Sequence, residues 1–222
     1  MIKRLFRIIA PQLERRNAYL SQSMVYNKIP PKIDLKRADF VRYATLELVR
    51  QEIERRSIAG SVAEVGVYKG DFASQLNRCF PDRKLYLFDT FEGFDTSDVE
   101  VERAKGYSTG EQDFSDTSVD LVLSKMVTPQ QCVVRKGFFP ETAKEIDDTF
   151  VFVSLDADLY QPIYEGLNYF YPRLEAGGYI FIHDVNNEEY KGARQALVQF
   201  CAEKGVGFVP IADYSGTAII CK

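Results

Sequence analysis

The run AEVGVYKG, residues 63–70, stands where a β-branched segment at 61–67 gives way to a helical pattern of apolar residues. Glycine at such a turn lets backbone N–H groups approach a ligand closely, and the N-terminus of the helix that follows is electropositive. The spacing is E-x-G-x-x-x-G, which differs from the G-x-G-x-x-G of dinucleotide-binding turns. Alone the motif is weakly specific, because a strand–turn–helix connection needs glycine for its shape.

The segments around this turn alternate between short apolar strands and helical patterns. Strands are expected at 61–67, 84–88, 132–136, 150–155, 179–182, 207–211 and 217–221. Helices are expected at 38–57, 72–80, 118–126, 160–174 and 192–203, with Gly177-Gly178 separating the fourth helix from the next strand. This order predicts an α/β fold, a three-layer sandwich with a mostly parallel seven-stranded sheet and an antiparallel C-terminal hairpin.

Two segments fall outside this alternation. Residues 1–57 are expected to form an N-terminal helical arm, with one or two short amphipathic helices in residues 1–26, ahead of a single domain at 58–222. Residues 92–117 are rich in Gly, Ser, Thr and Asp and are long for a loop in a compact domain. The aromatic residues Phe91, Phe94, Tyr107 and Phe114 favour a lid there, and a surface insert is the alternative.

The composition sets the class of protein. The chain has 222 residues, 45% of them hydrophobic and 27% charged, which is ordinary for a soluble globular domain and excludes intrinsic disorder. No apolar run approaches the roughly 20 residues of a membrane-spanning helix, and the N-terminus is a poor match to a signal peptide. The four cysteines form no C-x-x-C motif, so zinc and redox motifs are unsupported. A cytoplasmic protein without a membrane partner is expected.

The net charge of −4 is unevenly distributed, because residues 1–60 carry a balance of +7 and the remainder carries −11. No recognisable nucleic-acid motif accompanies the basic arm, so a nucleic-acid partner is not expected. A basic arm can instead dock on an acidic body or on a second subunit. We expect a homodimer acting on a small molecule.

A second acid follows the next strand. The strand at 84–88 ends in Asp89, 25 residues after Glu64, and a carboxylate there can accept both ribose hydroxyls. The missing central glycine disfavours a pyrophosphate above the turn, and with it a nicotinamide-dependent oxidoreductase. A nucleoside-bearing cofactor without a diphosphate is therefore favoured, which indicates S-adenosylmethionine.

Two further acidic motifs follow strands. Asp156-Ala157-Asp158 comes after the strongly apolar strand at 150–155, and His183-Asp184 comes after the strand at 179–182. Open α/β sheets bind their ligands at the carboxyl ends of the strands. His183 is the chain's single histidine. A lone histidine is more often structural than catalytic, but its place beside an acid at a strand end makes a functional role nearly as favoured as a structural one.

The runs EVGVYKG, DTFEGF, KGFFPET, SLDADLYQPIYEGLNYFYPRL and GGYIFIHD resemble the macrocin O-methyltransferase (TylF-like) family, over about residues 58–205. The resemblance implies the class I methyltransferase (Rossmann-like) fold and methyl transfer from S-adenosylmethionine to a hydroxyl, on a sugar of a natural product or polysaccharide. The E-x-G-x-Y-x-G element is also similar to catechol-type O-methyltransferases, which act on aromatic diols. A non-catalytic cofactor-binding protein of the same fold is a further alternative.

The resemblance also implies residue roles. The cofactor would be bound by Glu64, Gly66, Tyr68, Gly70, Asp89, Thr90, Phe91, Gly137 and Phe138. Asp156 and Asp184 would hold a divalent metal, usually magnesium. Where such enzymes commonly show two adjacent acids, this chain has His183-Asp184, so a metal is uncertain. Two hypotheses stay open: magnesium on Asp156 and Asp184, or His183 as a general base oriented by Asp156.

Overall fold

The computed structural model describes residues 32–33 and 39–222. The arm helices expected in residues 1–26 lie outside the described residues. Residues 32–222 form one compact unit, which includes helix α2 (Phe40–Arg55), although the expected boundary between arm and domain lay after residue 57. Within the described part of the chain, no helix combines the length and apolar character needed to cross a membrane.

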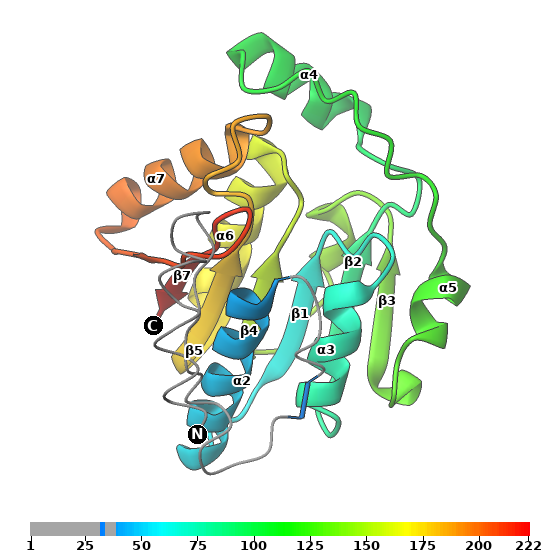
Figure 1. Ribbon diagram of the computed structural model, residues 1–222, viewed down its shortest axis with the longest axis vertical. Helices are drawn as coiled ribbons and strands as arrows, with labels where there is room; N and C mark the ends of the chain where they lie inside the picture. The colour runs from blue at the N-terminus through cyan, green and yellow to red at the C-terminus, as the bar shows by residue number, and fades with distance from the viewer. Residues whose placement is uncertain (1–31, 34–38) are drawn as a thin grey trace, which may run out of the picture. The chain divides into compact units, whose positions relative to one another are not determined.

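A seven-stranded sheet forms the centre of the unit (Figure 1). The strands are β1 Ser61–Val65, β2 Leu85–Asp89, β3 Cys132–Lys136, β4 Phe150–Leu155, β5 Leu174–Ile182, β6 Val209–Pro210 and β7 Ala218–Cys221. Their order is β3-β2-β1-β4-β5-β7-β6, with the first five parallel and β7 antiparallel to both neighbours. The predicted mostly parallel sheet with an antiparallel C-terminal hairpin is confirmed.

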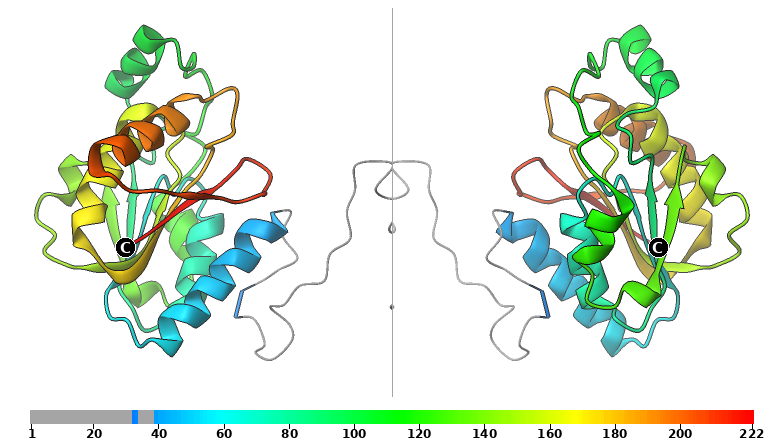
Figure 2. Two further views of the ribbon diagram at one scale, coloured as in Figure 1. Left: turned by 90° about the vertical axis from the view of Figure 1, so that its left-hand side faces the viewer. Right: turned by 90° about the vertical axis from the view of Figure 1, so that its right-hand side faces the viewer.

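Helices cover both faces of the sheet (Figure 2). Helices α2, α3 (Asp71–Cys79) and α5 (Val119–Ser124) contribute to one apolar core, and α6 (Tyr160–Arg173) and α7 (Gly192–Lys204) to the other. The central strand β4 is buried along its whole length, and its side chains are divided between the two cores, with Val151 and Phe152 in one and Phe150, Val153 and Leu155 in the other. Such two-sided burial explains why this strand is apolar throughout. Two short 3-10 turns, Pro129–Gln131 and Glu141–Ala143, flank β3.

The structure differs from the sequence-based expectation in two places. Helix α4 (Thr96–Lys105) lies within the segment expected to be an irregular lid. Its buried residues are the acids Asp98 and Glu102, so it has no apolar stripe by which to recognise it. In addition, β5 begins at Leu174 directly after α6, so that Gly177-Gly178 lies inside the strand instead of ahead of it.

Candidate functional site

A cavity of about 280 Å³ lies where β1, β2, β4 and β5 end. Ten of the predicted site residues line it: Glu64, Gly66, Tyr68, Asp89, Thr90, Gly137, Phe138, Asp156, His183 and Asp184. They come from five separate loops of the chain and are brought together because parallel strands present their carboxyl ends at one edge of the sheet.

Gly70 and Phe91, the remaining two predicted residues, do not line this cavity. Gly70 has a φ of 75° at the N-cap of α3, and its N–H donates to the Val67 carbonyl oxygen at 2.8 Å. The Phe91 side chain is buried in the apolar core on the α3 side of the sheet. Both residues therefore stabilise the turns that line the cavity without lining it themselves.

Gly66 brings the first strand loop against the fourth. Its φ is 82°, a left-handed conformation that favours glycine, and its N–H donates to the Phe88 carbonyl oxygen at 2.9 Å. A Cβ at this position would overlap the backbone carbonyl of Asp156. The glycine thus lets the turn and the Asp156 loop lie in direct contact.

Asp89 fixes the same turn through its carboxylate. One oxygen accepts the N–H groups of Val67 and Tyr68 at 2.7 and 2.8 Å, and the other accepts the Phe91 N–H at 2.6 Å. A carboxylate has about four acceptor positions, so about one position, on the oxygen that accepts the Phe91 N–H, stays open for a ribose hydroxyl. Asp89, the expected ligand-binding acid, therefore also holds the end of β2 to the turn that follows β1.

Glu64 supplies an unpaired polar atom in the cavity wall. Its side chain is buried, and its Oε2 has no hydrogen-bond partner among the described residues. Burial, with the nearby Asp156 charge, raises the pKa of this carboxyl well above its ordinary value. A cationic donor would relieve this cost, and the ammonium group of S-adenosylmethionine is such a donor. The residues present therefore fit this cofactor.

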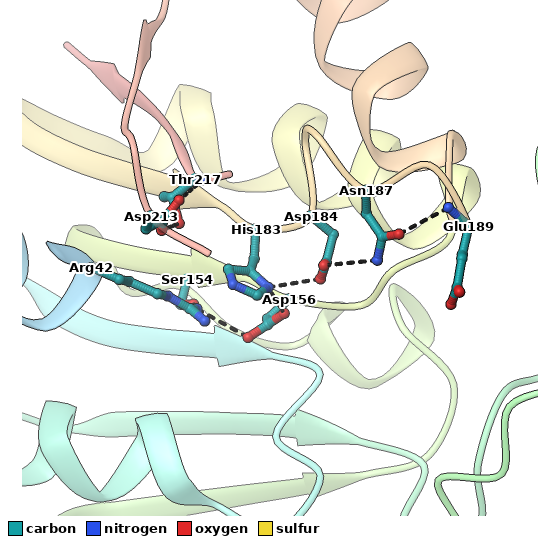
Figure 3. A network of polar contacts seen from close by, with 9 residues as sticks. All are labelled: Arg42, Ser154, Asp156, His183, Asp184, Asn187, Glu189, Asp213 and Thr217. Carbon is teal, nitrogen blue, oxygen red and sulfur yellow. Dashed lines mark hydrogen bonds and ion pairs between the residues drawn. The ribbon is translucent and has the colours of Figure 1, made fainter. Parts of the chain in front are cut away.

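A chain of polar contacts crosses the far end of the cavity (Figure 3). Arg42 of α2 donates to Asp156 Oδ2 at 3.0 Å, and His183 Nδ1 lies 2.9 Å from Asp156 Oδ1. The same Nδ1 lies 2.7 Å from Asp184 Oδ2, and Asn187 donates to Asp184 Oδ1 at 3.1 Å. These contacts bring Asp156, His183 and Asp184 together, as the sequence predicts.

The charges in this chain alternate and stabilise one another. Burial alone would lower the pKa of His183, but the Asp156 carboxylate raises it to about 10, so the ring is an imidazolium at neutral pH. Burial opposes ionisation of Asp156 as well, yet His183 and Arg42 hold the pKa of its carboxyl well below the usual range. Burial and the charge of Asp184 raise the pKa of Asp158.

Three cavity-lining residues other than glycine adopt left-handed backbone conformations: Tyr68, Asp158 and Asp184, with φ values of 47°, 57° and 57°. Such conformations are unfavourable for these residue types and persist only where the surroundings impose them. Their concentration around one cavity is typical of a functional site.

The expected magnesium site can be tested on its donor atoms. All four carboxylate oxygens of Asp156 and Asp184 already have a nitrogen partner, and the imidazolium and the guanidinium supply positive charge there. Mg²⁺ prefers a nearly octahedral set of oxygen ligands. As arranged, these residues do not fit Mg²⁺.

The segment at 92–117 closes the opposite side of the cavity. Phe94 and Phe114 line the cavity and contact each other with ring centroids 5.0 Å apart, and Phe114 also contacts Tyr68 at 5.1 Å. The Tyr68 hydroxyl donates to Asp116 at 2.6 Å. The aromatic residues that favoured a lid thus tie this segment to the glycine turn.

Two functional candidates were not predicted from the sequence. Arg42 shares the apolar face of α2 with Leu46, Val49 and Ile53, and a charged residue at such a position was the available signal. Asp98 lines the cavity from α4 with 6% of its surface exposed. Nothing in the polar sequence around Asp98 distinguishes it.

The strand order, the glycine turn and the acid that ends β2 define a class I S-adenosylmethionine-dependent methyltransferase. The family model for macrocin O-methyltransferase (TylF) matches residues 31–220, and the chain belongs to this family. It is accordingly an S-adenosylmethionine-dependent O-methyltransferase.

Several solved structures share this fold. The O-methyltransferase NovP is 18% identical, with a TM-score of 0.67 over 82% of this chain and 80% of its own. The calicheamicin methyltransferase CalS11 is also 18% identical, with a TM-score of 0.67 over 96% and 90%. TomG from Streptomyces achromogenes, solved with S-adenosylmethionine, is 15% identical, with a TM-score of 0.53 over 78% and 76%. A sequence search of curated proteins found no match.

Proposed function

We propose that the enzyme methylates a hydroxyl group on a sugar of a natural product or polysaccharide. Family membership supports hydroxyl methylation, and CalS11, which shares the fold, is described as a TDP-rhamnose 3'-O-methyltransferase. The observation that carries the proposal is the cavity itself, which joins the glycine turn at one end to the Asp156–His183 pair at the other.

The cofactor end of the cavity is assigned to the loops after β1, β2 and β3. S-adenosylmethionine supplies a methyl group activated by its positively charged sulfur. Asp89 would accept a ribose hydroxyl and Glu64 would accept the ammonium group, while Gly137 and Phe138 would contact the adenine. Gly66, Tyr68 and Thr90 would line the same half, with Gly70 and Phe91 supporting the turns.

The acceptor end is assigned to Asp156 and His183. The acceptor oxygen bonds to the methyl carbon as the carbon–sulfur bond breaks and its electron pair stays on sulfur. The hydroxyl proton must then leave, and because His183 already carries a proton, the Asp156 carboxylate is the group placed to receive it. Holding the reactants in line can supply roughly 7–11 kcal/mol of the barrier, and a positioned base contributes a further ~10²–10⁴ in rate.

An acceptor panel of free sugars, nucleotide sugars, glycosylated macrolides and catechols tests this proposal, with formation of S-adenosylhomocysteine as the readout. We expect turnover on a sugar and a loss of ~10²–10⁴ in kcat for Asp156→Asn. Preference for a catechol would contradict the sugar acceptor and indicate an enzyme that acts on an aromatic diol. Calorimetric binding of S-adenosylhomocysteine without turnover on any acceptor would favour a non-catalytic protein.

We also propose that the enzyme is a cytoplasmic homodimer. The opposite charges of residues 1–60 and the remainder support contact between subunits. Light scattering during size exclusion checks the assembly, and a mass close to the 25.4 kDa of one chain would contradict it.

A further inference from the structure

We infer that His183 and Arg42 replace the divalent cation in this centre, so that the enzyme transfers methyl groups without a metal ion. The inference rests on the proposed function and concerns how the same acceptor end is organised. It starts from the contacts of two carboxylates, Asp156 and Asp184.

Nitrogen atoms contact every oxygen that a cation would need. Asp156 faces Arg42 with one oxygen and His183 Nδ1 with the other, at 3.0 and 2.9 Å. Asp184 faces the same His183 Nδ1 at 2.7 Å and Asn187 Nδ2 at 3.1 Å. The ring nitrogen therefore lies between the two carboxylates that would hold a metal ion.

Arg42 is held in place from several directions. Its guanidinium carbon lies 3.9 Å from the centroid of the Phe72 ring, and its NH2 group also donates to Ser154 Oγ at 3.3 Å. Its side chain is only 6% exposed. Because stacking and hydrogen bonding both restrain it, the guanidinium cannot leave Asp156 without losing several contacts at once.

His183 has acids on a second side as well. A carboxylate oxygen from each of Asp39 and Asp213 lies within 4.8 Å of a nitrogen of the ring. Asp213 is itself fixed by the Thr217 N–H at 2.6 Å, and Asp39 caps α2. The ring thus lies among four carboxylates, and a divalent cation could reach both Asp156 and Asp184 only by displacing it.

This arrangement fixes the position of the Asp156 carboxylate. Two fixed donors, Arg42 and His183, hold its carboxylate in the cavity wall, and their placement takes over the restraint that a metal ion would supply. Arg42 acts through Asp156 and is a positioning residue, while His183 both positions Asp156 and lines the cavity.

Metal binding to the complete wild-type chain tests the inference directly, with Mn²⁺ as a paramagnetic probe. After EDTA treatment and in the presence of S-adenosylhomocysteine, water proton relaxation should show no saturable Mn²⁺ site. Methyl transfer should persist under exhaustive chelation. Stoichiometric Mn²⁺ binding, or activity lost on chelation and restored by Mg²⁺, would overturn the inference.

The matched variants are His183→Asp and His183→Asn. His183→Asp places two adjacent acids opposite Asp156, and we expect it to bind Mn²⁺ at least about tenfold more tightly than wild type. His183→Asn removes the ring without adding a carboxylate and should gain no site. Equal Mn²⁺ affinity in wild type and a folded His183→Asp would contradict the inference. If His183→Asp fails to fold, the wild-type measurement still decides.

The two levels of the proposal fail in different ways. Loss of the proposed function would appear as absent calorimetric heat with S-adenosylhomocysteine, whatever the Mn²⁺ result. Failure of the metal replacement would appear as Mn²⁺ binding in a protein that still binds S-adenosylhomocysteine normally.

Discussion

At the scale of single residues, the site depends on charged side chains placed where the core is otherwise apolar. Arg42 is buried beside Phe72, and Glu64 is buried at the end of β1. Buried charges cost free energy unless each has a partner. The Arg42–Asp156 pair meets that requirement, and Glu64 meets it only when a ligand is bound.

Replacing Arg42 by Met should therefore destabilise the protein, because it leaves the Asp156 carboxylate without its guanidinium partner. Removing one partner of a buried pair costs roughly 3–5 kcal/mol in the free energy of unfolding, which urea titration measures. Arg55→Met on the same helix breaks an exposed pair with Glu52 and should cost less than about 1 kcal/mol. Equal losses in the two variants would show that the Asp156 contact is unimportant.

Asp98 gives a prediction about pH. Burial, with the charges of Asp95, Glu102 and Glu165, raises its pKa from 3.8 to about 7. A raised carboxyl pKa adds stability while the group is protonated, and that stability is lost as the pH rises from about 4 to about 7.

Asp98→Asn should therefore gain stability relative to wild type over this interval, by at most about 1.4 kcal/mol per pH unit, and the difference should level off above pH 7. Thermal unfolding in a pH series measures it. The exposed Asp120→Asn controls for the loss of one negative charge. A difference that does not change with pH would exclude a buried ionisable group at position 98.

At the scale of elements, the segment at 92–117 and the loop after β4 meet at the N-terminus of α6. Helix α6 begins at Tyr160, shortly after Asp156, and its N-cap residue Leu159 has no side chain that can cap it. The cap is Glu102 of α4, whose carboxylate accepts the Tyr160 N–H. Ser108 donates to the same carboxylate at 3.1 Å. The segment at 92–117 therefore supplies a hydrogen-bond acceptor to the N-terminus of the helix that follows Asp156.

Glu102→Ala should loosen this contact, since losing a side-chain cap costs about 1 kcal/mol. We expect faster proteolysis within residues 92–117 and a higher acceptor KM, with calorimetric affinity for S-adenosylhomocysteine changed much less. Glu100→Ala lies on the exposed side of the same helix and serves as the control. Unchanged cleavage in Glu102→Ala would show that the lid is held by its aromatic contacts alone.

At the scale of the whole molecule, the layered architecture could be predicted because it rests on local patterns. Apolar strands such as Phe150–Leu155 and the spacing of their intervening helices indicated the sheet, and its seven-stranded form with the C-terminal hairpin is confirmed. Strand-end residues could be assigned to one edge for the same reason. The partners of buried charged side chains could not be predicted from the sequence. Arg42, for example, lies 114 positions before Asp156, and no spacing rule connects the two residues.

Ligand binding should stabilise this architecture as a unit. S-adenosylhomocysteine at about 100 times its Kd adds roughly 2.7 kcal/mol to the free energy of unfolding, which corresponds to a rise in Tm of about 5–11 °C for a domain of this size. Differential scanning fluorimetry measures the shift. NAD serves as the matched comparison, and an equal shift with NAD would contradict specificity for a cofactor without a diphosphate.

The contact between Gly66 and the Asp156 carbonyl has a consequence for how the enzyme can vary. Main-chain atoms alone set the spacing between the two halves of the cavity there, so side-chain exchanges elsewhere leave it untouched. The lid and the surrounding walls can diverge to admit new acceptors while that spacing stays constant. Enzymes of this family can therefore accept new substrates while the geometry of methyl transfer stays the same.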